Sequence, residues 1–313
     1  MIKTGLHVQS LEDLRLAASC LTIGAFDGIH LGHRKLLAAL VEAAGQQGLP
    51  AVVLTFHPHP SVVLHGQRPP FYLSSPDERA ALLAQLGIDA VVTQPFDERL
   101  SRVPAAEFLQ WLVDRLAPRA LWVGPDFALG YERHGDIPFL MGQAGSSGYQ
   151  LHVVEPLLVA GEVVSSSRIR QLVQAGDVRQ AAQLLGRWFA LPGQVEQGAG
   201  RGRQLGIPTA NLKVWPERAH PANGVYACLA QVDADRFQAV ANIGVRPTFD
   251  RAASSPIVEA HLLDFDGDLY GRTISLMLVE RLRDERKFEG VEALLAQIRR
   301  DIVQARQVLS TVS

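Results

Sequence analysis

A short apolar stretch that ends in glycines and leads directly to two histidines constrains this chain more than any other feature. It reads Leu21-Thr-Ile-Gly-Ala-Phe-Asp-Gly-Ile-His30-Leu-Gly-His33 and predicts a strand followed by the start of a helix. Helix starts expose unpaired N–H groups at the positive end of the helix dipole, and glycines let a ligand approach the backbone closely. The stretch therefore predicts an α/β unit with a site for the phosphates of a nucleoside triphosphate, formed by Gly24, Phe26, Asp27, Gly28 and Gly32.

The two histidines of this stretch are spaced so that they share one face of the helix. In that position His30 and His33 can donate hydrogen bonds to the α- and β-phosphates and stabilise the charge that grows as pyrophosphate leaves. An isolated pair with this spacing more often simply packs, and zinc binding is a further alternative. Zinc is disfavoured because no cysteine or carboxylate cluster lies nearby in the sequence, and Cys20 and Cys228 are far apart. The preceding strand and the glycines favour phosphate.

The composition limits the partners of the chain. Its 313 residues, 47% of them hydrophobic, suggest about two domains. A formal net charge of −2 provides no general attraction to nucleic acid or to a membrane. The sequence has no run of 18 apolar residues and only two cysteines, so neither a membrane helix nor a disulfide scaffold is expected. These features predict a cytoplasmic globular protein with no nucleic-acid or membrane partner, and they leave a homo-oligomer open.

Residues 1–185 alternate short apolar runs with helical patterns, as in a parallel sheet covered by helices. Open sheets of this kind bind ligands at the carboxyl ends of their strands. The proline- and histidine-rich segment 56–76 follows one such end and is interpreted as a mobile flap or as a plain surface loop. The predicted strands are Leu21–Gly24, Ala51–Phe56, Ala90–Thr93, Leu121–Val123 and Leu151–Val154, and the predicted helices include Arg34–Ala44, Pro76–Leu86 and Ala105–Leu116.

The pattern changes at Gly186, and residues 186–313 form a second predicted domain. Shorter runs of alternating residues favour antiparallel strands, and an amphipathic helix is expected from Val291 to Leu309. A small antiparallel β-barrel closed by a terminal helix fits this order. The predicted strands are Gly224–Val232, Phe237–Ile243, Ile257–Leu263 and Thr273–Val279.

Two further segments of the first domain are candidates for the nucleotide site. A serine-rich segment precedes a helical pattern and predicts a second phosphate clamp made of Ser165, Ser166, Ser167 and Arg170. Taken alone, it is also explained by a serine N-cap with surface arginines. Asp126 and Phe127 follow another strand end and are candidates for the adenine and ribose pocket, although a solvated turn explains them as well.

The second domain contains a glycine- and arginine-rich loop, Gly198–Gly206, that can wrap a polyphosphate but lacks the lysine of a standard P-loop. Thr209 and Asn211 follow it two residues apart on an extended segment, so their oxygen donors point the same way and can hold the Mg²⁺ that accompanies ATP. A structural turn at the barrel entry is the alternative. The residues expected to contact the phosphates are Gly202, Arg203, Gly206 and Pro208.

One acidic residue of the second domain stands among apolar neighbours on a predicted strand. Glu259 can act as a general base if a substrate hydroxyl lies beside it. The alternation of a half-exposed strand explains such a glutamate equally well.

Together these motifs resemble, across essentially the whole chain, the bacterial bifunctional riboflavin kinase and FAD synthetase family. The motifs similar to the adenylyltransferase half are Gly24–His33, Thr55–Pro60, Val123–Phe127 and Ser165–Arg170. Those similar to the kinase half are Gly202–Asn211, Asn242–Thr248 and Val258–Asp264.

The resemblance implies a nucleotidylyltransferase-like domain, a riboflavin kinase-like barrel and two reactions that use riboflavin, FMN and ATP. In the barrel, ATP would phosphorylate riboflavin, with Thr209 and Asn211 at Mg²⁺ and Glu259 as base. In the first domain, FMN would be adenylylated while His30, His33 and the serine and arginine clamp stabilise pyrophosphate. The resemblance also implies that Arg283 contacts the flavin. From composition alone, the segment Arg281–Phe288 is equally well explained as a solvated run of charged residues.

The chain departs from the family pattern after Phe127. Ala128-Leu129 stand where the family carries Arg-Phe, which removes a cation, and Arg133 is the nearby arginine that could replace it. This departure motivates an alternative in which a riboflavin kinase carries a nucleotide-binding first domain that is weakly active or regulatory. A third interpretation is an adenylyltransferase for a different acceptor.

Overall fold

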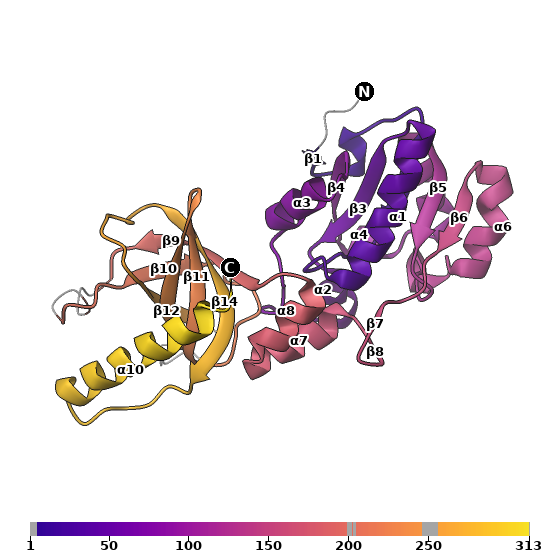
Figure 1. The fold of residues 1–313 in the computed structure, drawn as a ribbon. Coiled ribbons are helices and arrows are strands. Elements are labelled where there is room, and N and C mark those ends of the chain that lie inside the picture. Colours follow the sequence, from indigo (N-terminus) through magenta and orange to yellow (C-terminus); the bar gives the residue numbers. More distant parts are fainter. Residues whose placement is uncertain (1–4, 199–201, 203–204, 246–255, 313) are drawn as a thin grey trace. The chain divides into compact units, whose positions relative to one another are not determined.

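The computed structural model describes residues 5–198, 202, 205–245 and 256–312. Their contacts form two compact units, Met1–Arg68 with Ser74–Ser166, and Pro69–Leu73 with Ser167–Ser313. Figure 1 follows the chain through a parallel sheet into a barrel. The functional boundary at 185/186 stays a prediction, whereas the packing contacts change near residue 166.

The first unit is built on a six-stranded sheet of order β1-β4-β3-β2-β5-β6, in which all neighbouring strands are parallel. The central strands are buried on both faces, which explains why they read as continuous apolar runs. The strands are β1 (Leu6–Val8), β2 (Ser19–Ile23), β3 (Ala51–His57), β4 (Ala90–Pro95), β5 (Pro118–Val123) and β6 (Gln150–Val153).

Helices cover both faces of this sheet (Figure 1). On one face, α1 packs against a cluster that includes Leu37, Leu40 and Val53. On the other, α5 contributes Phe108 and Leu112 to a larger cluster. The helices are α1 (Leu31–Gln47), α2 (Pro60–His65), α3 (Pro76–Gln85), α4 (Glu98–Ser101), α5 (Ala105–Leu116) and α6 (Ile137–Ser147), with 3₁₀ turns η1 (Leu11–Asp13) and η2 (Tyr131–Arg133) and a hairpin of β7 (Leu158–Val159) and β8 (Glu162–Val163).

Local signals set where these helices begin. Ser75 and Glu78 form a reciprocal capping box at the start of α3, and Pro76 occupies the first turn, where no N–H is needed. Asp136 caps α6 through the N–H of Phe139. Such caps satisfy N–H groups that have no partner inside the helix.

The segment after β3 is buried at residues 71–74, so neither the mobile flap nor the plain surface loop expected for residues 56–76 describes this part of it. Phe71, Tyr72 and Leu73 are buried, and Tyr72 has no exposed surface. The N–H groups of Phe71 and Tyr72 both donate to the carbonyl of Glu217. These three consecutive residues belong to the second unit. Their contacts with residues such as Glu217 join segments that are far apart in the sequence, and composition does not reveal such contacts.

The second unit is a closed antiparallel barrel of order β10-β13-β12-β11-β14-β9. The helix α10 packs Ala305 and Leu309 against Val225, Val240 and Val279 of the barrel. Its elements are α7 (Ser166–Ala175), α8 (Val178–Leu185), β9 (Phe189–Glu196), β10 (Ala210–Val214), β11 (Gly224–Val232), β12 (Asp235–Val245), β13 (Pro256–Leu262), β14 (Thr273–Arg283) and α10 (Val291–Leu309).

The predicted fold class, a parallel α/β domain followed by a small antiparallel barrel and a terminal helix, is confirmed. The sequence analysis predicts no strand at β1, β7, β8, β9 or β10. β1 is very short, and β9 contains Pro192-Gly193, which reads as a turn. Gly193 is required there because a Cβ would lie 2.8 Å from the carbonyl oxygen of Lys213. None of the helices in the described ranges combines the length and hydropathy needed to span a bilayer.

Candidate functional site

The strand order of the first unit has a topological switch point between β2 and β5. The chain moves from β2 outward to β3 and β4 on one side and continues with β5 and β6 on the other. Open α/β sheets commonly bind ligands at the carboxyl ends of the two strands that flank a switch point. The loops in question are 24–30, after β2, and 124–136, after β5, and both carry predicted site residues.

His30 and His33 form a stacked pair at the start of α1. His30 is the N-cap, and its Nδ1 accepts a hydrogen bond from the N–H of His33 at 3.2 Å. The two ring centroids are 3.6 Å apart with an interplanar angle of 15°, and Phe26 meets His33 edge-on. Because Nδ1 of His30 accepts, a neutral ring carries its proton on Nε2, which makes Nε2 the donor of this ring.

The loop before His30 is held in a strained conformation. Phe26 and Ile29 have φ values of 46° and 40°, in the left-handed region that β-branched residues in particular avoid. Gly28 also has a positive φ, 79°. Strain of this kind persists only where surrounding contacts enforce it, and it gathers at functional sites.

One of those contacts joins two motifs that are far apart in the sequence. Ser166 Oγ donates to the carbonyl of Asp27 at 2.8 Å, across 139 positions. A Cβ on Gly32 would lie 3.2 Å from the His30 ring and 3.4 Å from the carbonyl of Val164, so glycine allows the chain segments to approach. The serine segment and the histidine segment therefore meet. Further along the clamp, the Arg170 guanidinium lies 5.3 Å from the centre of the Phe71 ring.

The Asp27 carboxylate points into the protein. It is 1% exposed, accepts from the N–H and Oγ of Ser74, and lies 3.8 Å from Nη2 of the buried Arg79. Ser74 Oγ in turn accepts from the N–H of Gly28 at 3.0 Å. Asp27 thus orients the loop through this network. The sequence analysis did not single out Arg79 or Ser74, because nothing in a helical charge pattern marks an arginine for burial.

The loop after β5 is also strained, and it brings an arginine to Asp126. Leu129 and Gly135 exchange backbone hydrogen bonds of 3.1 and 2.9 Å, which close a small loop. Within it Gly130, Glu132 and Arg133 all have positive φ. Arg133 Nη2 donates to the carbonyl of Asp126 at 2.6 Å, so a cation lies beside the exposed turn where Ala128-Leu129 lack one.

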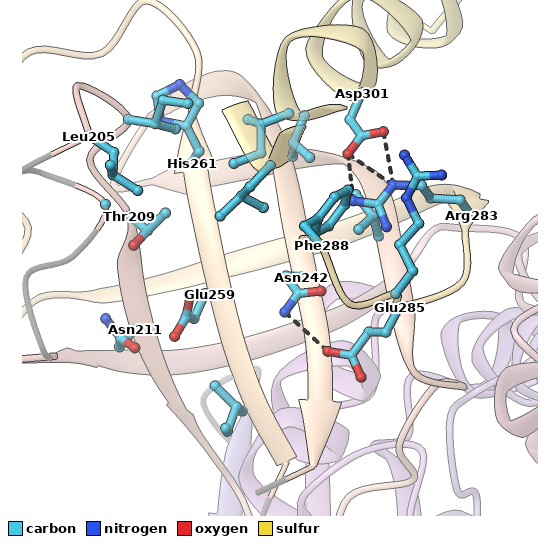
Figure 2. A pocket seen from close by; sticks show the side chains of 18 residues that line it. Leu205, Thr209, Asn211, Asn242, Glu259, His261, Arg283, Glu285, Phe288 and Asp301 are labelled. Atoms are coloured by element: carbon cyan, nitrogen blue, oxygen red, sulfur yellow. Dashed lines mark hydrogen bonds and ion pairs between the residues drawn. The ribbon is translucent and has the colours of Figure 1, made fainter. Parts of the chain in front are cut away.

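In the barrel, three polar side chains form a row across adjacent strands. Asn211 on β10 is the register partner of Glu259 on β13, and Glu259 is the partner of Asn242 on β12. Register partners project from the same face, so the three side chains lie next to one another, as Figure 2 shows. Nδ2 of Asn242 donates to the carboxylate of Glu285 at 3.3 Å. The sequence analysis gives Asn242 no role beyond its place in the motif Asn242–Thr248, because strand register cannot be deduced from the sequence alone.

Two pockets of the barrel share the same wall. A pocket of about 680 Å³ is lined by Glu259, Asn242 and the inner side of α10, and one of about 470 Å³ is lined by the 265–270 loop. Thr209 and Asn211 line both pockets, as does Gly202. A ligand in either pocket would therefore meet these residues.

The donor set on this wall suits a hard divalent cation. Thr209, Asn211 and Glu259 offer hydroxyl, amide and carboxylate oxygens, the ligands that Mg²⁺ and Ca²⁺ prefer. No group of three or more His, Cys, Asp or Glu side chains suited to a metal is found in the described part of the chain. A cation here would thus depend on phosphate oxygens for much of its coordination. His261 Nδ1 and the carbonyl of Pro208 lie 2.7 Å apart, which ties β13 to the segment that carries Thr209.

Part of the glycine-rich loop lies outside the described residues, including Arg203 and residues 199–201. Gly202 is described, and a Cβ there would lie 2.4 Å from the carbonyl of Ile207. Gly206 has a φ of 73°. The motif Asn242–Thr248 is described only as far as residue 245.

The far wall of the larger pocket is apolar, with one ion pair at its edge. Leu294 and Ile298 of α10 and Phe288 line it, together with Arg283 and Asp301. Arg283 makes a bidentate ion pair with Asp301, and Nη2 to Oδ2 is 2.8 Å (Figure 2). The wall combines a surface for a large apolar ring with a fixed polar group.

Comparison with known proteins assigns both units. The FAD synthetase family model matches residues 13–168, and the riboflavin kinase model matches residues 185–309. The bifunctional riboflavin kinase/FMN adenylyltransferase of Pseudomonas fluorescens is 39% identical over 286 residues, 91% of each chain. That of Escherichia coli K12 is 37% identical over 305 residues, 97% of this chain and 96% of the relative.

A solved structure from Streptococcus pneumoniae, described as a macrolide-efflux protein, has 28% identity, covers 98% of this chain and 99% of its own, and aligns with a TM-score of 0.88. Its likeness extends over both units and concerns the fold. With both family models matched in order and relatives similar over nearly their whole length, this chain belongs to the bifunctional riboflavin kinase/FMN adenylyltransferase family.

Proposed function

We propose that the chain phosphorylates riboflavin to FMN in its barrel and adenylylates FMN to FAD at the switch point of its parallel sheet. Family membership supports both activities. The observation that carries the kinase assignment to particular residues is the Asn211, Glu259 and Asn242 row beside a wall shared by two pockets.

The kinase proposal assigns one pocket to each substrate. The flavin ring lies in the larger pocket against Phe288, Leu294 and Ile298, because that pocket combines a volume of about 680 Å³ with an apolar helix face. ATP lies in the smaller pocket, lined by the 265–270 loop. The ribityl 5′-hydroxyl and the γ-phosphate then meet at the shared wall.

Glu259 acts as the general base in this arrangement. It takes the proton of the 5′-hydroxyl as the hydroxyl oxygen forms a bond to the γ-phosphorus, and the bond between that phosphorus and the β–γ bridging oxygen breaks to release ADP. Asn242 lies next to Glu259 and can donate to the transferring phosphoryl oxygens, while Gly202, Arg203, Gly206 and Pro208 contact the ATP phosphates.

Both ATP-dependent steps use a divalent metal, and we propose Mg²⁺ as that metal. When bound, it neutralises the phosphate charge that builds up in the transition state. Thr209 and Asn211 would hold it through their side-chain oxygens, since both face both pockets.

The adenylyltransferase proposal uses the loops on both sides of the switch point. An FMN phosphate oxygen attacks the α-phosphorus of ATP, and the bond to pyrophosphate breaks. His30 and His33 donate to the phosphates, helped by Ser165, Ser166, Ser167 and Arg170, while Gly24, Phe26, Gly28 and Gly32 let the nucleotide approach the backbone. Asp126 contacts the nucleoside, and Arg133 supplies the cation absent from Ala128-Leu129. Asp27 contributes by holding the loop.

The test is a time course with purified protein, riboflavin, ATP and Mg²⁺, with the flavins separated by chromatography. FMN is expected first and FAD second. FMN that accumulates without FAD, even when FMN and fresh ATP are supplied, would leave the kinase and refute the adenylyltransferase. Omitting Mg²⁺ and then supplying Mn²⁺ or Ca²⁺ tests the choice of metal. A cytoplasmic location, a homo-oligomer and the absence of a nucleic-acid partner remain predictions.

A further inference from the structure

The ion pair between Arg283 and Asp301, at the edge of the larger pocket, is largely buried. The side chain of Asp301 on α10 is 3% exposed and that of Arg283 at the end of β14 is 20% exposed. Nε of Arg283 lies 3.0 Å from each carboxylate oxygen, and Nη2 lies 2.8 Å from Oδ2. This fork geometry fixes the plane of the guanidinium.

Further contacts lock both partners. Gln297, one helical turn before Asp301, donates from Nε2 to Oδ1 of Asp301 at 2.7 Å, and its Oε1 accepts from Arg286. Arg283 Nη1 donates to the carbonyl of Asp284 at 2.8 Å. The helix face that presents Gln297 and Asp301 also presents the pocket-lining residues Leu294 and Ile298, at spacings of three and four residues.

This network leaves part of the guanidinium for a ligand. Arginine has five N–H donors, and the contacts above use the one on Nε, one on Nη1 and one on Nη2. Among the described residues, no acceptor meets the remaining two. Because Asp301 neutralises the charge, the pair suits a neutral carbonyl acceptor better than a phosphate.

We infer that Asp301, supported by Gln297, is a positioning residue for the kinase reaction, and that it aims the two remaining N–H groups of Arg283 at the carbonyl edge of the flavin ring. The inference rests on the proposed function of this pocket. It assigns ring recognition to Arg283 and Asp301, and it leaves the phosphoryl transfer to the opposite wall.

The test compares Asp301→Asn, Arg283→Gln and the double variant in the full-length protein. Each single substitution is expected to raise the KM for riboflavin by roughly ten- to a hundredfold, as the loss of a charge-assisted hydrogen bond does, with the KM for ATP unchanged. The double variant is expected to match Arg283→Gln, because Asp301 acts only through Arg283. Arg306 lies on the same helix as Asp301 and makes an exposed ion pair with Asp264, which follows β13. Arg306→Ala breaks that pair and is the matched control, which should leave the KM for riboflavin unchanged.

A purely structural role for the pair is distinguished by Arg283→Lys. Lysine keeps the charge beside Asp301 but has no planar fork, so thermal stability should be retained while the KM for riboflavin rises as in Arg283→Gln. A lysine variant with the KM of the unmodified protein would overturn the inference, as would an unchanged KM in Asp301→Asn.

Binding without turnover separates this inference from the proposed function. Titration of flavin fluorescence gives a Kd for riboflavin and for lumichrome, which has the ring system without the ribityl chain. Both Kd values should rise together in Asp301→Asn. If the unmodified protein binds neither compound, the assignment of the pocket fails. If it binds both and Asp301→Asn binds them equally well, the positioning role alone fails.

Discussion

At the scale of single residues, the role proposed for Glu259 as general base rests on its place between Asn211 and Asn242 on the adjacent strands. Substitution by Gln removes the base but preserves shape, so the kcat for riboflavin phosphorylation should fall by about 10²- to 10⁴-fold. FMN adenylylation, measured with supplied FMN, should not change. Glu280→Gln removes another barrel carboxylate, one paired with Arg179, and is the control. A Glu259→Gln variant with unaltered kcat would contradict the base assignment.

His33 provides the corresponding residue-scale prediction for the first unit. His33→Ala removes a donor at the start of α1, and FAD synthesis should fall by roughly 10²- to 10³-fold while riboflavin is still converted to FMN. His65→Ala changes an exposed histidine at the end of α2 and should affect neither product. Loss of both products in His33→Ala would instead indicate misfolding, which a thermal unfolding curve would reveal.

At the scale of elements, the loop after β5 depends on Gly130. Its φ is 75°, and a Cβ would lie 2.4 Å from Cα and 2.6 Å from N of Ala105 at the start of α5. Gly130→Ala should therefore lower the free energy of unfolding by about 1–3 kcal/mol and slow FAD synthesis. Gly142 lies within α6, and a Cβ there would meet no atom within 4 Å apart from the neighbouring helix backbone. Gly142→Ala should therefore raise the free energy of unfolding by up to about 1 kcal/mol. Equal effects of the two substitutions in chemical denaturation would refute the argument.

The same loop presents Arg133 beside Asp126. Arg133→Ala should reduce kcat/KM for FMN adenylylation by roughly tenfold or more, because a charge-assisted contact to an anionic substrate is lost. Riboflavin phosphorylation, measured in the same sample, should stay constant. Arg102→Ala removes another exposed arginine of this unit, one paired with Glu98, and serves as the control. Unchanged adenylylation in Arg133→Ala would contradict the proposal that Arg133 supplies the cation missing at Ala128-Leu129.

At the scale of the whole molecule, the division of the contacts predicts how the chain can be cut. α8 buries Val178, Leu184 and Leu185 and packs on β14, although it precedes the predicted boundary at 185/186. A fragment 167–313 should therefore unfold at a higher temperature than a fragment 186–313. Both fragments lack Pro69–Leu73, which also belongs to the second unit, so the loss of that segment does not affect the comparison. Identical melting temperatures for the two fragments would show that α8 contributes nothing to the barrel.

Local pattern was sufficient for much of this molecule. Apolar runs marked the central parallel strands because these are buried on both faces. The predicted strand Gly224–Val232 matches the bounds of β11, in which residues 224–228 are all buried and residues 229–232 alternate between half-buried and buried. The period of α10 gave its bounds as Val291–Leu309. Elements that contain residues atypical of their structure are not predicted. Strand β9, for example, contains Pro192-Gly193, which is typical of a turn.

By itself, the sequence determined the two-domain class, the helix start at His30 and the motifs that carry the family resemblance, because each depends on neighbouring residues. Only the tertiary structure decided that Ser166 meets Asp27, that Asn211, Glu259 and Asn242 form one row, and that Asp301 holds Arg283. These contacts join residues 18 to 139 positions apart or depend on strand register. Register and long-range contacts arise from how the whole chain packs its apolar faces, and no local pattern contains them.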